Sequence, residues 1–338
     1  MLIPTTYETA LALAIVSMLC WGSWANTVKF AGKQWRFELL YFDYSIGVLL
    51  AAVIAAFTLG QQGTELSFLD NMVVTGKRQL LYAVAGGIVF NLANILLVAA
   101  ISIAGMSVAF PIGIGLALVI GVIWNFLISP QGNPVFLFSG VGLVLFAIIL
   151  DSLAFKAHRK NIAEAAGKRV KSPLKGIVVS LLSGVLMGSF YPIVELSKTG
   201  EIPLGPYAIA FCFSIGVFFS TFVFNSYFMN LPVHGKPVDF RLYFQGTFLQ
   251  HFLGVLGGIL WCTGAISNFV AASAPKAVQV GPAISYALGQ GATLVSALWG
   301  LLFWREFKNA SGKVGMLITL MLLFFVAGLA LIAIAPLK

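Results

Sequence analysis

The sequence predicts an all-α membrane protein whose ten transmembrane helices form two inverted five-helix repeats. Three observations predict it: 59% of the 338 residues are hydrophobic, only 9% are charged, and long apolar runs recur along the chain. A soluble domain carries about 25% charged residues, because charge covers its water-facing surface. The runs are unbroken and about 20 residues long, which is the length a helix needs to cross the hydrocarbon core, whereas barrel strands alternate apolar and polar residues.

The apolar runs define the expected helices and one polar division. We expect helices at 8–30, 38–60, 79–101, 105–128, 134–155, 175–197, 205–229, 246–272, 276–303 and 312–335. Polar residues then divide the chain into a first repeat, a basic loop and a second repeat, at 1–155, 156–174 and 175–338. No small-residue cleavage site follows the first run, so we expect a retained helix there and not a signal peptide.

Short motifs recur in the same order in the two halves. The pairs are Gly86-Gly87-Ile88 with Pro111 and Gly257-Gly258-Ile259 with Pro282, Ser45-Ile46-Gly47-Val48 and Ser214-Ile215-Gly216-Val217, and Ser139-Gly140 and Ser311-Gly312. This order indicates an internal repeat. Because five helices is an odd number, the second copy must enter the membrane from the opposite side. Inverted repeats are typical of alternating-access transporters, which bind their substrate near the midplane between the repeats.

Basic residues determine the expected orientation. Most of the 20 Lys and Arg residues lie in loops that follow odd-numbered helices, among them Lys29, Arg36, Lys168 and Arg305. The positive-inside rule then places the central loop in the cytoplasm and both termini outside. This arrangement explains the net charge of +9 without a nucleic-acid partner. We expect a multi-pass protein of the cell (inner) membrane, surrounded by the lipid bilayer, as a monomer or homodimer.

Reactive side chains do not form the clusters that metal or catalytic sites need. Cys20, Cys212 and Cys262 lie inside apolar runs without metal-type spacing, so we expect small buried apolar side chains and no disulfide framework. A membrane enzyme is disfavoured because no cluster with acids or cysteines is formed by the three histidines, His158, His234 and His251. We expect no cofactor and no metal.

Several stretches resemble one transporter family. They are Tyr41-Phe42-Asp43-Tyr44, Leu49 to Ile54, Thr58-Leu59-Gly60, Ala85-Gly86-Gly87-Ile88-Val89 with Asn91 and Asn94, and Ala277-Val278-Gln279 through Trp299-Gly300 to Arg305-Glu306. Over nearly its whole length the chain resembles the ureide permeases of the drug/metabolite transporter (DMT) superfamily, near the bacterial glucose/ribose and rhamnose porters. The resemblance implies a ten-helix DMT-type fold and proton-coupled uptake of neutral polar solutes. The central loop is much shorter than in plant ureide permeases.

Two acids inside predicted helices are candidates for proton coupling. Asp43 lies about one turn inside the second helix and matches the Tyr-x-Asp-Tyr pattern of the family that the chain resembles. Glu195 lies in the sixth helix near Pro192, whose ring frees a backbone carbonyl. An aspartate at the bilayer centre costs about 2.5–3.5 kcal/mol, so such residues face a cavity or a partner. The alternatives are an interfacial ion pair of Asp43 with Arg36 or Lys33, and snorkelling of Glu195 to the helix end.

Amides and aromatic rings are the candidate substrate ligands. Each amide offers donors and an acceptor, which suits a hydroxyl-rich sugar or a urea-like group, and tryptophan stacks on a sugar face or a planar heterocycle. The candidates are Asn91, Asn94, Gln279, Tyr286, Gln290, Trp21, Trp24 and Trp261. Their alternative roles are interhelical hydrogen bonds for the amides and an interfacial aromatic belt for the tryptophans.

These features together predict a secondary active transporter. Its expected activity is proton-coupled import of a small neutral polar metabolite by alternating access, with a sugar first and a ureide or nucleobase-like solute second. The alternative is export of amino acids, nucleobases or drugs, because a proton-coupled exporter also needs an acid. A channel is disfavoured by the inverted repeat.

Overall fold

The described part of the chain contains helices and no strand. The computed structural model describes residues 1–338 except 33, 64–65, 105, 166–173, 233–235, 279, 309 and 338, and only the backbone at 106–108, 110–111, 159 and 161–165. The long helices are α1 (Tyr7–Ser23), α3 (Phe37–Phe57), α5 (Lys77–Ala104), α6 (Met106–Ile128), α7 (Pro134–Ala165), α8 (Leu174–Glu195), α9 (Pro206–Asn230), α10 (Phe248–Ala271) and α13 (Gly312–Ile334). The shorter elements are α2 (Asn26–Phe30), α4 (Phe68–Val74), α11 (Pro282–Gly289), α12 (Ala292–Leu298), the π-helical turn η4 (Trp299–Phe303), and the 3-10 turns η1 (Leu59–Gln61), η2 (Leu196–Lys198), η3 (Phe240–Gln245) and η5 (Ala335–Leu337).

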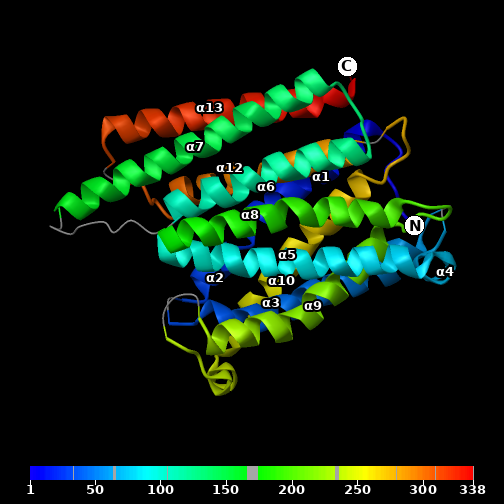
Figure 1. Ribbon diagram of the computed structural model, residues 1–338, viewed down its shortest axis with the longest axis horizontal. Helices are drawn as coiled ribbons and strands as arrows, with labels where there is room; N and C mark the ends of the chain where they lie inside the picture. The colour runs from blue at the N-terminus through cyan, green and yellow to red at the C-terminus, as the bar shows by residue number, and fades with distance from the viewer. Residues whose placement is uncertain are drawn as a thin grey trace.

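The helices have the length and composition of membrane spans. Within the described residues, nine helical segments are long and apolar enough to cross a membrane, and Ile112–Ile128 is a shorter apolar helix. The predicted all-α membrane class is therefore confirmed. Both termini lie at one end of the bundle, and the end of α7 and the start of α8 lie at the other (Figure 1). We call these the terminal end and the central-loop end.

Helix α7 is longer than the sequence predicts. It continues past 155 to Ala165, through part of the stretch expected to be a loop. The added residues include Lys156, Lys160 and Glu164, which are good helix formers although they are polar. Loss of apolar character therefore marks where α7 leaves the hydrocarbon, and not where the helix ends. The rest of the predicted loop, 166–173, lies outside the described residues.

Two of the predicted helices are broken. The first divides into α1 and α2, and the ninth begins at Pro282 instead of 276 and divides at Gln290 and Gly291 into α11 and α12. Gly281 precedes α11 with a φ of 82°, a left-handed conformation that glycine adopts without strain. Helix α4 has no counterpart among the predicted helices, because it is too short to produce a membrane-length apolar run.

Local hydrogen bonds define several helix starts. The Thr6 side chain accepts from a backbone N–H of α1, and Ser67 does the same for α4. At the start of α10, Thr247 and Gln250 form a reciprocal capping box. Pro206 occupies the first turn of α9, where no intrahelical N–H bond is lost. These residues satisfy backbone donors that lipid cannot satisfy.

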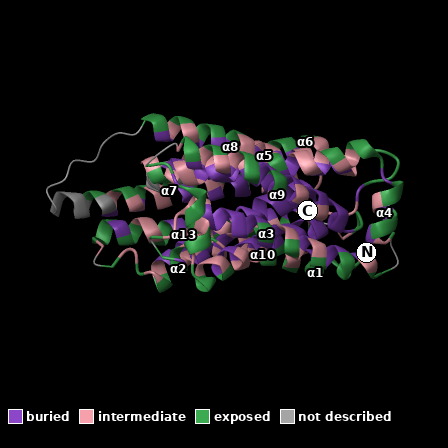
Figure 2. Ribbon diagram, turned by 90° about the horizontal axis from the view of Figure 1, so that it is seen from below, coloured by how far each residue is buried: buried purple, intermediate pink, exposed green. Residues whose placement is uncertain are grey.

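Helix contacts repeat when the two halves of the chain are exchanged. Helix α5 packs against α8 and α9, and α10 packs against α1 and α3. Helix α6 contacts α8 and α7, as α12 contacts α1 and α11 contacts α13. Helices α7 and α13 run side by side along one edge (Figure 1). Buried residues are dense where α3, α9 and α10 meet (Figure 2), so part of the core lies between the halves.

Glycines of the recurring motifs lie at helix crossings. At four of them an added Cβ atom would overlap a backbone carbonyl oxygen of the facing helix: Gly47 against Val255, Gly258 against Tyr44, Gly87 against Phe213, and Gly216 against Val84. Helix α3 thus crosses α10, and α5 crosses α9, with their backbones in contact. Small residues allow this approach, which supplies van der Waals attraction where lipid offers no hydrophobic drive. The third motif pair differs, because an added Cβ would meet α13 at Gly140 and open space at Gly312.

Adding a methyl group at these crossings should lower stability. We expect Gly87→Ala and Gly258→Ala each to lower the free energy of unfolding by about 1–3 kcal/mol, the usual cost of overpacking. Thermal melting of the detergent-purified protein measures the effect. Gly142→Ala is the matched control, because nothing lies within 4 Å of its added Cβ. Equal melting temperatures for the control and the crossing variants would contradict the close approach.

Candidate substrate-binding site

A cavity of about 330 Å³ lies inside the bundle, and we call it the central cavity. Its lining comes from both halves of the chain: from α1, α2, α3, α5, α6, α7, α8, α10, α11 and α12, and from the segment after η4. The exposed fraction rises along it, from 5% at Trp261 and 8% at Gln290 to 44% for the Lys29 side chain. The cavity therefore has a buried part and a mouth, and the mouth lies at the end of α2, toward the central-loop end (Figure 1).

Aromatic rings form the buried part of the central cavity. The Trp261 ring stacks on Phe90 with centroids 4.1 Å apart and on Trp21 with centroids 5.8 Å apart. The Trp21 indole N–H donates to the Trp261 carbonyl oxygen at 3.1 Å, which fixes this pair. Phe190 adds a ring from α8. Such a surface suits a flat solute, because ring faces stack on other planar groups.

Two amides reach the same space. Gln290 lines the cavity, and none of the described residues hydrogen-bonds its side-chain amide. Asn94 is 4% exposed and donates from Nδ2 to the Tyr41 hydroxyl at 3.1 Å, which leaves its Oδ1 as an acceptor. Buried side-chain amides normally have partners. The Gln290 amide and Oδ1 of Asn94 are thus open to the cavity, where a bound solute or water can supply their partner.

The backbone is irregular beside these groups. The break between α11 and α12 falls at Gln290 and Gly291, and the break between α1 and α2 falls at Trp24 and Ala25. Except for Gly291, these residues all line the central cavity. Irregular backbone at membrane depth is tolerated only where it is buried in protein or lines a cavity. Broken helices of this kind form the substrate sites of many secondary transporters.

Charged side chains lie at the mouth of the cavity. Lys29 forms an ion pair with Glu306, and its ammonium group lies 5.0 Å from the ring centroid of Trp304. Arg305 adopts a φ of 50°, and this turn lets the Glu306 carboxylate approach Gly300, which has no side chain to obstruct it. The ion pair connects α2 in the first half to the segment after η4 in the second half.

A second carboxylate faces the same mouth and is absent from the sequence prediction. Asp151 on α7 lines the cavity, close enough to Glu306 for their negative charges to repel. A signal for Asp151 exists in the sequence, because it is an acid at the end of an otherwise apolar run. Glu306 gives no comparable signal, since it lies in a loop and reaches the cavity only through the turn at Arg305.

The structure brings five of the predicted substrate ligands together in one lining. They are Trp21, Trp24, Asn94, Trp261 and Gln290. Gln279 lies outside the described residues. Tyr286 does not line the cavity, and its hydroxyl lies 3.3 Å and 3.2 Å from the carbonyl oxygens of Ala117 and Met187.

Asn91 is also outside the lining, because it is held between helices. Its Oδ1 accepts from the Tyr41 hydroxyl at 2.8 Å, and its Nδ2 donates to Ser220 at 2.8 Å and to Thr221 at 3.1 Å. The residue is fully buried. Asn91 therefore joins α5 to α3 and α9, while Asn94, one turn away, faces the cavity.

Asp43 lies outside the central cavity, where α3 packs on α10. It is 3% exposed, accepts from the Tyr243 hydroxyl at 2.6 Å, and lies 2.9 Å from Nδ1 of His251. Burial and the neighbouring carboxylate raise the pKa of Tyr243, so the phenol keeps its proton and donates it to Asp43. Of the two partners in the alternative interpretation, Arg36 pairs instead with Glu38 at 2.6 Å, and Lys33 lies outside the described residues.

Glu195 is likewise buried away from the cavity lining. Its Oε1 lies 2.7 Å from Nζ of Lys198, three residues further along the chain. Glu195 therefore forms an ion pair with Lys198 near the end of α8. Cys212 and Cys262 are buried as expected, and Cys20 is partly exposed.

Comparison with known proteins decides the family. The ureide permease family model matches residues 40–173 and 165–335. The chain belongs to the ureide permease family. Among relatives, Ureide permease 1 of Arabidopsis thaliana is 26% identical and Ureide permease 2 of the same organism is 25% identical, each covering 96% of this chain and 96% of the relative. The Glucose uptake protein GlcU of Bacillus subtilis (strain 168) is 24% identical, covering 94% of this chain and 96% of its own.

Membership of the ureide permease family makes the chain a multi-pass membrane transporter of small metabolites, as the sequence predicts. A protein of known crystal structure, 16% identical, superposes with a TM-score of 0.57 over 96% of both chains, which shows a shared fold. The alignment with Ureide permease 1 spans 387 positions, more than the 338 residues of this chain. That relative therefore carries segments that this chain lacks.

Asn91 and Gln290 should respond differently to removal of the amide. Asn91→Leu leaves buried hydroxyl groups without their partner, and an unsatisfied buried group costs about 1–3 kcal/mol. Gln290→Leu removes an amide that none of the described residues binds, so we expect an unchanged melting temperature. Thermal melting without solute measures both. A larger loss for Gln290→Leu than for Asn91→Leu would show that Gln290 supports the fold instead.

Proposed function

We propose that the protein imports a small, flat, neutral solute of the ureide or nucleobase type across the inner membrane, coupled to protons. The solute binds in the central cavity, between the rings around Trp261 and the amides of Asn94 and Gln290. The names of the relatives support the general class, since Ureide permease 1 is named for ureides and GlcU for glucose uptake. The protein acts as a secondary active carrier, and its cavity opens to one side of the membrane at a time.

The Gln290 amide carries the choice of solute. It is 8% exposed, lies at the helix break, and lacks a hydrogen-bond partner among the described residues. An amide edge presents one acceptor beside donors, which matches the N–H and C=O groups of a cyclic urea. The stacked rings of Trp261 and Phe90 supply a flat face for the same ring. Both features favour a planar solute that hydrogen-bonds through its edge.

The small number of free polar groups argues against a sugar. A hexose carries several hydroxyl groups, and each loses hydrogen bonds to water on entering the cavity. In the buried part, the Thr293 hydroxyl already donates to the Gln290 carbonyl, and the Ser296 hydroxyl donates to the Gly22 carbonyl. Within the described residues, the groups of the buried part left without a partner are the Gln290 amide, Oδ1 of Asn94 and the indole N–H groups of Trp24 and Trp261. We therefore place a ureide or nucleobase-like solute above a sugar, which reverses the order expected from the sequence.

Alternating access follows from two opposed halves. We propose that ten helices form two inverted repeats, with α1 to α7 in the first and α8 to α13 in the second. The exchangeable helix contacts and the matched crossings at Gly47, Gly87, Gly216 and Gly258 support this arrangement. If the central loop is cytoplasmic, as the basic residues predict, the mouth of the central cavity opens to the cytoplasm in this conformation. Rocking of the halves about the crossings then exposes the solute to the other side.

Proton coupling is proposed for Asp43, with Glu195 as the second acid. Asp43 belongs to the first half, and His251 and Tyr243 belong to the second, so its hydrogen bonds join the two halves. Protonating the carboxyl replaces an acceptor by a donor, which changes the attraction to His251. Its protonation is therefore linked to the motion of the halves and not to contact with the solute. Glu195 pairs with Lys198 inside its own half.

Solute selectivity is the first expected outcome. We expect uracil or allantoin, and neither glucose nor rhamnose, to raise the melting temperature of the detergent-purified protein. A solute at about one hundred times its dissociation constant adds roughly 2.7 kcal/mol of stability. Gln290→Leu should abolish the increase, whereas Gln245→Leu, which changes an exposed amide, should retain it. Stabilisation by a sugar alone would replace the ureide proposal with sugar transport.

Proton coupling is the second expected outcome. In proteoliposomes, Asp43→Asn should abolish accumulation driven by a pH gradient while solute counterflow continues, because the amide preserves shape but cannot carry the proton. Glu195→Gln should show a smaller loss. Asp151→Asn is the informative comparison, since Asp151 lines the cavity and Asp43 does not. Loss of driven accumulation in Asp151→Asn alone would move the coupling site to the cavity mouth.

A further inference from the structure

A second cavity of about 300 Å³ lies beside the central cavity, and we call it the outer cavity. It is enclosed by the start of α3, the last turns of α5 and the end of α9. Phe37 and Val98 line both cavities, so these two side chains form the partition between them. The Arg36 side chain, 37% exposed, lies at its rim.

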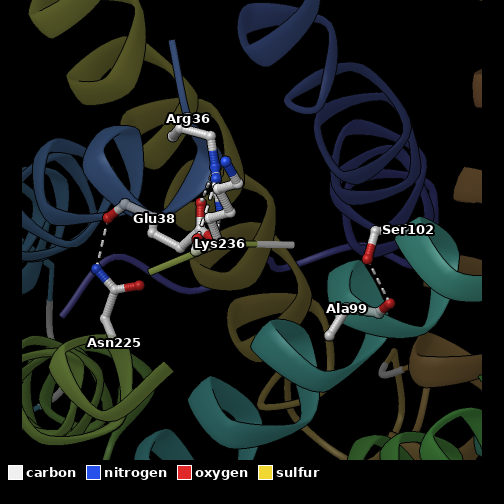
Figure 3. Close-up of polar contacts among 6 residues, drawn as sticks. All are labelled: Arg36, Glu38, Ala99, Ser102, Asn225 and Lys236. Atoms are coloured by element: carbon white, nitrogen blue, oxygen red, sulfur yellow. Dashed lines mark hydrogen bonds and ion pairs between the residues drawn. The ribbon is translucent and has the colours of Figure 1, made fainter. Parts of the chain in front are cut away.

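The polar groups at the rim form a neutral unit (Figure 3). The Arg36 guanidinium donates to both carboxylate oxygens of Glu38, at 3.1 Å and 2.6 Å, and to the Lys236 carbonyl oxygen at 3.4 Å. The hydrogen bond to Glu38 raises the pKa of Arg36, so the guanidinium remains charged. A two-pronged pair of this kind satisfies both partners and leaves little net charge. The rim therefore selects neither for anions nor for cations.

Asn225 supplies a hydrogen-bond acceptor that has no donor among the described residues. It lies on α9, is 1% exposed, and donates from Nδ2 to the Glu38 carbonyl oxygen at 2.5 Å. Its Oδ1 is buried and has no hydrogen-bond partner among the described residues. Figure 3 shows this oxygen turned away from Glu38. Flipping the amide would place two carbonyl oxygens in contact, so the oxygen must remain the free atom. Buried acceptors are normally paired, which points to a ligand with an N–H or O–H group.

The remaining walls are apolar or already hydrogen-bonded. Helix α5 contributes Ile95, Val98 and Ala99, and the Ser102 hydroxyl donates to the Ala99 carbonyl oxygen at 2.7 Å (Figure 3). The outer cavity thus combines an apolar wall, a neutral rim and one free acceptor. This combination fits a small neutral solute that carries an N–H donor. The central cavity calls for the same chemistry.

We propose that the outer cavity is a second binding subsite for the transported solute, with Asn225 Oδ1 accepting one of its N–H groups. The inference rests on the proposed function, because its ligand is the solute carried through the central cavity. The solute moves between the subsites when the Phe37 ring shifts. That ring contacts Tyr41 with centroids 5.0 Å apart, and the Tyr41 hydroxyl accepts from Asn94 in the central cavity. Occupancy of one subsite is thereby sensed at the other.

Equilibrium dialysis of the full-length purified protein with radiolabelled uracil or allantoin tests this subsite. We expect two equivalents per chain, and one equivalent for Asn225→Leu. Ala99→Phe fills the outer cavity without altering Asn225, so it should also bind one equivalent, which separates occupancy from misfolding. Gln290→Leu should lose the other equivalent, and the double variant Gln290→Leu with Ala99→Phe should bind none. Asn230→Leu, an exposed amide on the same helix, should keep two.

Different failures of this experiment point to different proposals. One equivalent in the unaltered protein, with no change in Asn225→Leu or Ala99→Phe, overturns the outer subsite and leaves the proposed function standing. Two equivalents that persist in Ala99→Phe also overturn it, because the second site then lies elsewhere. Binding of neither solute to the unaltered protein overturns the proposed function, and the subsite with it.

Discussion

Where α3 crosses α10 and α5 crosses α9, glycines bring the backbones of opposite halves into contact. Within lipid there is no hydrophobic drive between helices, so the close fit of backbones supplies much of the attraction. These crossings also position the site. Phe90 and Asn94 project from α5 and Trp261 from α10, so the crossings of α5 with α9 and of α10 with α3 bring the rings and the amide to one cavity. In the proposed alternating access, the same contacts join the halves that move against each other.

In the proposed function, the polar groups left free in the central cavity select the solute. Trp21, Thr293 and Ser296 hydrogen-bond within the protein, whereas none of the described residues hydrogen-bonds the Gln290 amide or the indole N–H groups of Trp24 and Trp261. The few that remain therefore determine which solute loses least on leaving water. The outer cavity repeats this pattern: Arg36 and Glu38 satisfy each other's charge, and the Asn225 oxygen has no partner among the described residues. The two proposals therefore call for one solute chemistry.

Three acids of the bundle are accommodated in different ways. Glu195 has a lysine in its own half, whereas Asp43 relies on His251 and Tyr243 across the boundary between halves. Glu306 pairs with Lys29 across the same boundary at the cavity mouth. In the proposed alternating access, a bond across the boundary changes when the halves rock, and a bond within one half does not. Charge placement thus separates groups that stabilise a half from groups that respond to its motion.

The sequence by itself determined the membrane class, the family and the crossing motifs, because apolar run length and local glycine patterns are properties of short segments. It also proposed Trp21, Asn94 and Gln290 as ligands, and the structure places these three residues in one cavity lining. Only the tertiary structure decided that the Asn91 amide is hydrogen-bonded to Tyr41 and Ser220, while Asn94 faces the cavity. The tertiary structure also brings Glu306 to the cavity through a turn, and it leaves the Asn225 side-chain oxygen without a partner among the described residues. Whether a polar group is free depends on which helix faces it, and that is determined by packing between distant segments.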